Sequence, residues 1–160
     1  MGRRALLRAL ATALVAGGVL TAASPSHAEE HGTRGQAQAM VAKAIALYDE
    51  KGKAAFEIMD QGAASGFRQE DLYIFVIGPG PDARVVAHGL DPQRIGQVVA
   101  VLTDSRGKPY GKALLAGATP QGAWVDYDRI NPQSGKEEPK SSWVVLHDGY
   151  IFGCGVYVGP

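Results

Sequence analysis

The sequence has little of what a disulfide scaffold, a cysteine-rich metal centre or a nucleic-acid-binding protein requires. It contains one cysteine, Cys154, which excludes an internal disulfide and any site built from several cysteines. Its 16 basic and 16 acidic residues cancel, so it lacks the excess of Lys and Arg expected of a protein that binds nucleic acid. The whole chain of 160 residues is 46% hydrophobic and 20% charged, a composition typical of one soluble globular domain.

The first 28 residues have the pattern of a secretory signal peptide. Arg3, Arg4 and Arg8 precede an uncharged apolar run over residues 10–23, and small residues flank His27 in Ser26-His27-Ala28. A membrane anchor is the alternative, but a run of about 14 residues is shorter than the roughly 20 that a spanning helix needs. We therefore predict cleavage after Ala28 and a periplasmic or secreted protein, with a flexible N-terminus over residues 29–36 and one domain over residues 37–160.

Hydrophobic periodicity predicts an α+β domain. Apolar residues at helical spacing indicate a long helix over residues 37–50, with a second helical stretch over 53–59. The run 72–77 is apolar on both faces, which is typical of a central strand. Further strands are expected at 84–88, 122–127, 141–146 and 150–158, and a short helix at 110–116. A helix followed by five strands, joined mostly by hairpins, predicts an antiparallel sheet with the helix packed on it.

Several short blocks occur in an order that resembles a known family. They occupy residues 47–56, 71–76, 86–88, 104–109, 122–127 and 131–136, Pro-Lys-Ser-Ser at 139–142 and Gly-Cys-Gly-Val-Tyr at 153–157. Together these blocks cover nearly all of residues 37–158 and resemble the single Cache domain family. The resemblance implies a PAS-like fold, in which a long N-terminal helix packs on a five-stranded antiparallel sheet. It also implies a pocket on the other face of that sheet for a small ligand, usually a short organic acid.

The resemblance further implies a sensory role, because Cache domains usually form the sensing part of membrane signalling proteins. We therefore expect a membrane-bound signalling partner, and we also consider a homodimer formed through the N-terminal helix. Two positions depart from the family pattern: Arg129 lies near a common Trp position, and Trp143 stands where Tyr is favoured. The sequence ends after the last predicted strand, so we expect a free-standing module.

Motifs for catalysis are absent from the sequence. It has no Gly-x-Ser-x-Gly, no His-Glu-x-x-His, no phosphate-binding loop and no dinucleotide fingerprint. In the predicted domain His88, His147 and Cys154 lie on separate elements, which disfavours a metal site. We predict a protein that is not an enzyme and that needs no cofactor or metal.

Residues suited to bind a carboxylate are present. A buried anion needs a cation and neutral hydrogen-bond donors, because its desolvation is otherwise not offset. The candidate ligand-binding residues are Tyr73, His88, Tyr127, Arg129, Lys140 and Trp143. Each has a structural alternative: Tyr73 can belong to the core, Arg129 and Lys140 can be solvated hairpin charges, and His88 can cap a turn.

These features predict a secreted or periplasmic sensor module that binds a short organic acid. We expect Lys140 to be exposed, with its stem packed on Trp143 and its ammonium at the ligand. The rival interpretations are a scaffold or interaction protein whose pocket has closed, and an accessory factor of a periplasmic redox system. Cys154 alternates with apolar residues on the last strand, so we expect it to be buried and unreactive.

Overall fold

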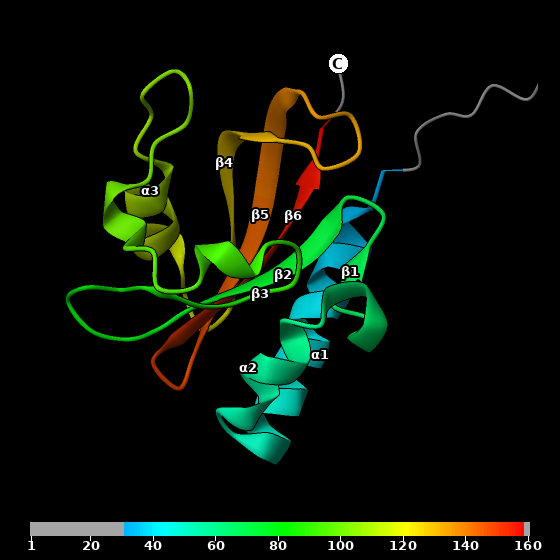
Figure 1. Ribbon diagram of the computed structural model, residues 1–160. Coiled ribbons are helices and arrows are strands. Elements are labelled where there is room, and N and C mark those ends of the chain that lie inside the picture. Colours follow the sequence, from blue (N-terminus) through cyan, green and yellow to red (C-terminus); the bar gives the residue numbers. More distant parts are fainter. Residues whose placement is uncertain (1–30, 159–160) are drawn as a thin grey trace, which may run out of the picture.

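A computed structural model of the chain describes residues 31–158 (Figure 1). The predicted signal peptide, residues 1–28, lies outside this range. The helices are α1 (Arg34–Lys51), α2 (Ala54–Met59) and α3 (Tyr110–Gly117), and short 3-10 turns occupy Gly62–Ser65, Pro92–Arg94 and Val99–Val101. The strands are β1 (Arg68–Gln69), β2 (Leu72–Ile77), β3 (Val85–His88), β4 (Ala123–Ile130), β5 (Glu137–His147) and β6 (Tyr150–Tyr157).

Helix α1 begins earlier than its hydrophobic pattern predicts because a capping box starts it. The Thr33 hydroxyl accepts a hydrogen bond from the backbone amide of Gln36 at 3.2 Å. The side-chain oxygen of Gln36 in turn accepts one from the backbone amide of Thr33 at 2.7 Å. Just before the helix, the Gly32 amide donates to the buried carboxylate of Asp71 at 2.8 Å. The predicted flexible N-terminus over residues 29–36 is therefore wrong from residue 31 onward, because these polar residues cap the helix and tie the chain to the sheet.

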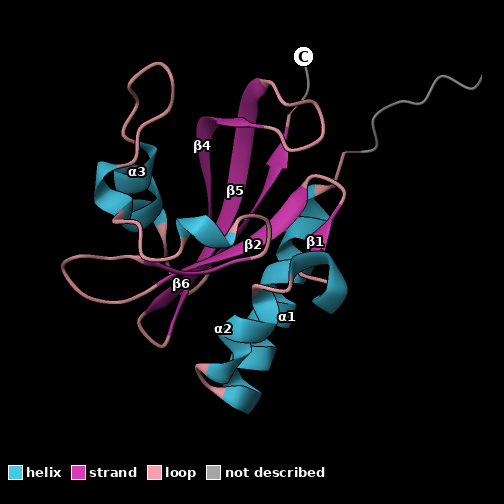
Figure 2. Cartoon of the chain, viewed as in Figure 1, coloured by secondary structure: helices cyan, strands magenta, loops and turns pink. Residues whose placement is uncertain are grey.

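The strands form one antiparallel sheet in the order β1-β2-β6-β5-β4, with β3 also paired to β2 (Figure 2). β1 pairs with the start of β2 and β3 with its end, so both lie along the edge of β2 that β6 leaves open. The predicted five strands are all present, and the two-residue β1 adds a sixth. The prediction of an α+β fold with an N-terminal helix on an antiparallel sheet is confirmed.

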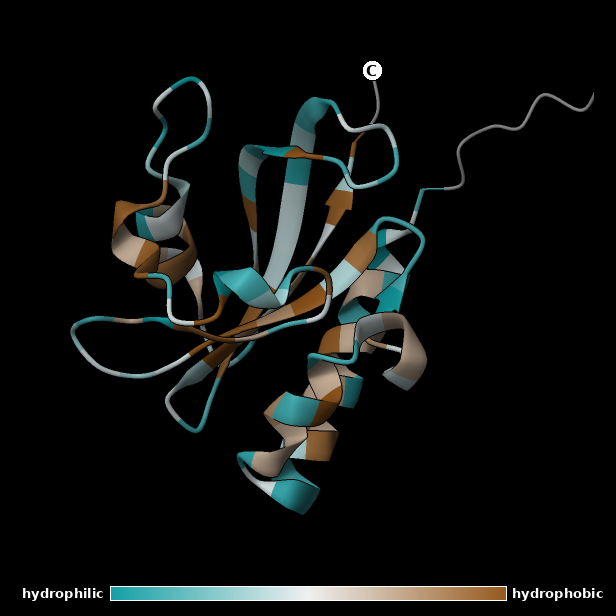
Figure 3. Ribbon diagram, in the orientation of Figure 1, coloured by the Kyte–Doolittle hydropathy of each residue, from teal (hydrophilic) through white to brown (hydrophobic). Residues whose placement is uncertain are grey.

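Each face of the sheet carries its own hydrophobic core. Helices α1 and α2 cover one face, where alternate residues of β6, from Tyr150 to Val156, pack against the buried stripe of α1. On the other face, α3 and the segment around Val99 cover residues such as Phe75 and Val144 (Figure 1). Hydrophobic residues concentrate along the central strands and α3, whereas the loop over 103–109 is hydrophilic (Figure 3). The face under α3 is the one that bears the pocket.

Candidate ligand-binding site

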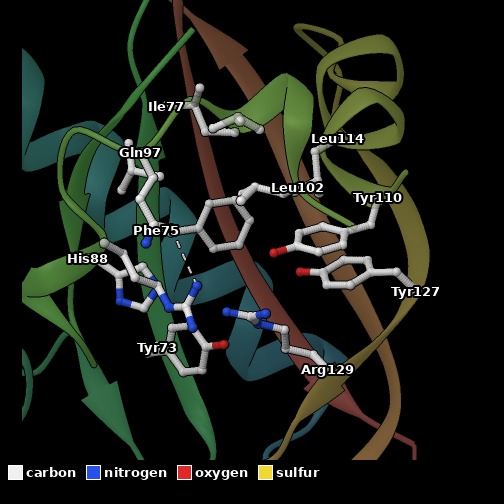
Figure 4. A pocket seen from close by; sticks show the side chains of 13 residues that line it. Tyr73, Phe75, Ile77, His88, Gln97, Leu102, Tyr110, Leu114, Tyr127 and Arg129 are labelled. Atoms are coloured by element: carbon white, nitrogen blue, oxygen red, sulfur yellow. Dashed lines mark hydrogen bonds between the residues drawn. The ribbon is translucent and has the colours of Figure 1, made fainter. Parts of the chain in front are cut away.

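A pocket lies on the α3 side of the sheet, between β2, β3 and β4 below and the segment 94–114 above (Figure 4). The space in which the centre of a water molecule can move is about 40 Å³, and one water needs about 10–15 Å³ by this measure. The pocket is therefore open, but only to a molecule of a few non-hydrogen atoms. Its lining consists of Tyr73, Phe75, Ile77, Val85, His88, Arg94, Gln97, Val99, Leu102, Tyr110, Leu114, Tyr127 and Arg129.

The lining divides into an apolar and a polar half. Phe75, Ile77, Leu102 and Leu114 gather at one end, and hydroxyl, imidazole, amide and guanidinium groups gather at the other (Figure 4). Two arginines line the polar half, and no Asp or Glu does. This arrangement suits a small molecule with an anionic head and a short apolar part.

Tyr110 and Tyr127 form a stacked pair that brings two hydroxyl groups to the middle of the pocket. Their ring centroids are 4.7 Å apart at an interplanar angle of 9°. Tyr110 begins α3, which packs so closely that a Cβ on Gly111 would lie 1.7 Å from the Val99 carbonyl oxygen. Burial raises the pKa of both phenols, so both remain protonated at neutral pH. The Tyr127 hydroxyl shares a 2.8 Å hydrogen bond with Ser142.

Tyr73, on β2, has a hydroxyl that can donate to a ligand. It lies 3.4 Å from the Tyr157 hydroxyl, and Tyr157 donates its own proton to the Ile130 carbonyl at 2.6 Å. Tyr73 is therefore the donor in the 3.4 Å contact with Tyr157. Because that hydrogen bond is long and weak, donating the proton to a ligand instead costs Tyr73 little free energy. Burial alone would raise the pKa of Tyr73, but the nearby Lys140 ammonium outweighs burial and lowers it.

His88 combines the two alternatives considered for it. Its Nδ1 accepts the amide of Asp91 at 3.0 Å and that of Leu90 at 3.4 Å, so it caps the turn after β3. Because Nδ1 is an acceptor, this geometry assigns the proton to Nε2. Burial, followed by the charge of Arg94, lowers the pKa of His88 to about 3, which keeps the ring neutral at physiological pH. The ring also packs on Tyr73, with centroids 5.1 Å apart, and lines the pocket.

Arg129 points toward the middle of the pocket from β4 (Figure 4). Its guanidinium carbon lies 5.6 Å from the centroid of the Tyr110 ring. Its cross-strand neighbour Glu138 is occupied elsewhere, because that carboxylate accepts hydrogen bonds from Asn131 and Ser134. No ion pair within residues 31–158 includes Arg129. Its charge is therefore available to an anion.

Lys140 is buried, contrary to the prediction that it is exposed. It is 1% exposed, and its ammonium lies 3.8 Å from the centroid of the Tyr73 ring and 4.7 Å from that of Tyr157. Its stem fits over Gly155, where a Cβ would lie 2.3 Å from Lys140 Cε. Within residues 31–158 the ammonium has no hydrogen-bond partner. Lys140 does not line the pocket itself but lies behind Tyr73, which does.

Trp143 lies on the opposite face of the sheet, so the structure does not bring it to the pocket. It packs against the core beneath α1 and against Trp124, with ring centroids 5.4 Å apart. Strand alternation is the reason: Ser142 and Val144 face the α3 side, so Trp143 between them faces α1. The predicted contact between Trp143 and the stem of Lys140 is wrong for the same reason.

The structure brings four of the six predicted site residues into the lining, namely Tyr73, His88, Tyr127 and Arg129. Arg94, Gln97 and Tyr110 also line the pocket, but they were not predicted from the sequence. Arg94 and Gln97 lie in a segment that reads as loop, and only its folding over β2 and β3 places them at the pocket. The Arg94 guanidinium makes only long contacts. Its Nε lies 3.5 Å from an Asp91 carboxylate oxygen, and one terminal nitrogen lies 3.5 Å from the side-chain oxygen of Gln97.

A second, broader hollow lies beside β4 and contains paired charges. Arg106 forms an ion pair with Asp128 at 3.0 Å, and Arg34 donates to Ser141 at 3.2 Å. The Asp104 carboxylate accepts hydrogen bonds from three backbone amides at 2.8–3.5 Å, two in the loop it closes and one in β4. Lys140 also lines this hollow, together with the carboxylates of Asp104, Asp126 and Asp128. These carboxylates make it a weaker candidate for an anion than the pocket under α3.

Residues 31–158 contain no group of three His, Cys, Asp or Glu side chains placed to hold a metal ion. No helix in the same range is long and apolar enough to cross a membrane.

Comparison with solved structures shows the same fold in chemotaxis proteins. The chain is similar to a methyl-accepting chemotaxis protein from Vibrio parahaemolyticus RIMD 2210633, with 19% identity, a TM-score of 0.60, and coverage of 77% of this chain and 86% of that one. A periplasmic sensor domain of a chemotaxis protein is 23% identical, with a TM-score of 0.58 and coverage of 78% and 94%. A Cache chemosensory domain described in terms of carboxylic acid recognition is 21% identical, with a TM-score of 0.53 and coverage of 78% and 87%.

The family is established by a match to its sequence profile. Similarities to solved structures at these identities establish a shared fold alone, and no curated protein matches the chain significantly. The sequence profile of the family described as Single Cache domain 2, however, matches residues 27–159, which is most of the chain. The resemblance noted from the sequence blocks is confirmed, and the chain belongs to the Single Cache domain 2 family.

Proposed function

We propose that this Cache domain binds a short organic acid in the pocket under α3 and acts as the sensory module of a signalling system. Cache domains are extracytoplasmic ligand-binding modules of membrane signalling receptors, so a role in sensing a small molecule follows from the family. The class of ligand and the residues that hold it are our proposal.

The observation that carries the proposal is an excess of positive charge. Arg129 and Arg94 line the pocket, no Asp or Glu lines it, and the buried ammonium of Lys140 lies one aromatic ring away. Asp91, 3.5 Å from Arg94, is the one carboxylate paired with these cations in the described part of the chain. Burying a cation without an anion or hydrogen-bond partner is costly. An anionic ligand would offset that cost, and a carboxylate matches the planar fork of a guanidinium group.

The neutral groups support an acid rather than a bare inorganic anion. Tyr73, Tyr110 and the Nε2 of His88 offer hydrogen-bond donors to a carboxylate, while the opposite end of the pocket is apolar. A carbon chain on the acid would pack against Phe75 and Leu114 there. The small cavity limits this chain to a few carbon atoms. One neighbour of similar fold is itself described in terms of carboxylic acid recognition, which favours the same class.

The remaining parts of the proposal concern transport and signalling. The signal-peptide pattern in residues 1–28 supports export, with cleavage after Ala28. A membrane-bound partner would then receive the signal, and the exposed face of α1 is the proposed place for a homodimer contact. The rival interpretation, a scaffold with a closed pocket, predicts that no small acid binds.

A thermal-shift screen tests the proposal. A ligand that binds only the folded state stabilises it by about 2.7 kcal/mol at one hundred times its Kd. We expect at least one acid of two to four carbons to raise the melting temperature at fixed pH and ionic strength, and matching chloride salts to have no effect. Arg129→Gln is expected to reduce the shift, whereas Arg68→Gln, at an exposed position on β1, serves as the control. If no acid in the panel shifts the melting temperature, the proposal of acid binding is wrong.

A further inference from the structure

Lys140 and Tyr73 are two buried polar side chains in direct contact. The Lys140 ammonium lies 3.8 Å from the centroid of the Tyr73 ring and, within residues 31–158, has no hydrogen-bond partner. In the same range the Tyr73 hydroxyl takes part in one side-chain hydrogen bond, the 3.4 Å contact with Tyr157. A charge buried in this way is costly unless an opposite charge forms beside it.

No carboxylate of the described chain serves as the counter-ion of Lys140. No ion pair within residues 31–158 includes it. The hollow that Lys140 also borders contains Asp104, Asp126 and Asp128. The first two accept hydrogen bonds from backbone amides and from a serine hydroxyl, and the third forms an ion pair with an arginine. The phenol oxygen of Tyr73 is therefore the group best placed to become the missing negative charge.

The surroundings of Tyr73 favour its ionised form. The titratable side chains around its ring are His88 on β3, Arg94 before the pocket roof, Tyr110 on α3, Tyr127 and Arg129 on β4, Lys140 on β5 and Tyr157 on β6. None of them is a carboxylate. His88 is neutral, and burial raises the pKa of the three other phenols, so they keep their protons. Burial alone would raise the pKa of Tyr73 too, but the charge of Lys140 outweighs it and lowers that pKa.

We propose that Tyr73 and Lys140 form a proton-linked pair, in which Tyr73 loses its proton more readily than an ordinary phenol and becomes the counter-ion of Lys140. While Tyr73 is protonated, its hydroxyl donates to an anion in the pocket. Once it is ionised, its charge repels the anion and occupies the positive field of Lys140. Anion binding and proton binding are thus coupled, and the pocket responds to alkaline pH as well as to its ligand. The coupling rests on the proposed function, whereas the pairing does not.

Ultraviolet titration of the purified protein tests the pairing without any ligand, because a phenolate absorbs at a longer wavelength than a phenol. The chain has six tyrosines, so one early ionisation gives one sixth of the total absorbance change. We expect such a step below the ordinary tyrosine value of about pH 10. Tyr73→Phe is expected to abolish the step, and Lys140→Met to move it to higher pH. Lys43→Met removes an exposed lysine that lies over Phe67, and it is expected to leave the step unchanged.

Calorimetric titration over the same pH range tests the coupling, with the acid that gives the largest thermal shift. Affinity is expected to fall above the pH of the early step, by up to about tenfold per pH unit, and Tyr73→Phe should flatten this fall. The pairing is overturned if no early step appears, or if the step is unchanged in Tyr73→Phe or Lys140→Met; the proposed function then stands. An affinity that stays constant across the step overturns the coupling. Binding of no acid overturns the proposed function and leaves the pairing to the ultraviolet titration.

Discussion

Replacing Lys140 by methionine separates the cost of its buried charge from the packing of its stem. Lys140 is 1% exposed, and within residues 31–158 its ammonium has no hydrogen-bond partner. Methionine fills the space of the stem but carries no charge, and its end group packs well against aromatic rings such as Tyr73 and Tyr157. Alanine would be a poorer choice, because the cavity it leaves costs about 2–4 kcal/mol by itself.

The expected change in stability is an increase. Removing an ammonium from water costs several kcal/mol, and contact with two aromatic faces returns about 2 kcal/mol or somewhat more. The balance leaves a net cost of about 1–3 kcal/mol that Lys140→Met removes. For a domain of this size, a gain of 1 kcal/mol corresponds to about 3–5 °C in melting temperature.

The expected change in ligand binding has the opposite sign. A carboxylate beside the pocket-facing edge of Tyr73 would lie on the order of 8 Å from the ammonium, where two unit charges attract by about 2 kcal/mol at an effective dielectric constant of 20. Lys140→Met should therefore weaken acid binding by about thirtyfold while it raises the melting temperature. Urea unfolding and calorimetric titration of the same preparations measure both effects.

Lys43→Met is the matched control. The Lys43 ammonium also lies over an aromatic ring, 4.4 Å from the centroid of Phe67, but it is exposed and donates to the carbonyls of Ser65 and Gly66. Its loss should lower stability slightly and leave ligand binding unchanged. If Lys140→Met instead lowers stability by 1 kcal/mol or more, the ammonium is favourably placed, and our account of an uncompensated charge is wrong.

Four further predictions concern other parts of the chain. The pKa of His88 is lowered to about 3 in the folded state, so between about pH 6.5 and pH 3 the unfolded chain binds a proton at His88 that the folded chain does not. The contribution of neutral His88 to the free energy of unfolding is complete above pH 6.5 and is lost as the pH falls toward 3, by up to about 1.4 kcal/mol per pH unit. Urea unfolding of His88→Asn at several pH values should show a shallower fall of stability with pH, and an identical fall contradicts the assignment. Cys154 is buried and burial raises its pKa to about 12, so a thiol reagent should label it only in denaturant; rapid labelling of the native protein would show otherwise. In Gly153→Ala the new Cβ would lie 2.2 Å from the Phe75 ring, so stability should fall by about 1–3 kcal/mol and acid binding should weaken; unchanged melting and binding would contradict the placement of that ring. The exported protein should begin just after Ala28, as mass spectrometry can determine, and recovery of an intact N-terminus would contradict cleavage.

Much of the fold was predictable because its signals are local. The apolar run over 72–77 marks β2, and alternation along 150–157 correctly assigns Phe152 and Cys154 to one face. The start of α1 was missed because residues 31–36 look polar, and polarity conceals a capping box that satisfies the first amides of the helix. A Thr followed three residues later by Gln was the signal that could have located it.

The site was predictable only where strand residues form it. Tyr73 and Tyr127 lie on predicted strands, and both line the pocket. Arg129 was expected in a hairpin loop after a strand ending at residue 127, but β4 continues to Ile130 and carries it into the lining. Arg94 and Tyr110 reach the pocket through the path of the connection from β3 to α3, which no periodicity describes. For Lys140 the error came from treating a charged residue as exposed by default, although Gly155, diagonally across on β6, leaves room for the stem to lie flat on the sheet.

The most direct test of the central claim is calorimetric titration of the purified protein and its Arg94→Gln/Arg129→Gln double variant, with the acid that gives the largest thermal shift. Both arginines line the pocket and neither belongs to the buried core, so the variant should fold. Our account predicts saturable binding of one acid per chain to the native protein and loss of binding in the double variant. Unchanged binding in a folded double variant, or no binding of any acid to the native protein, would contradict it.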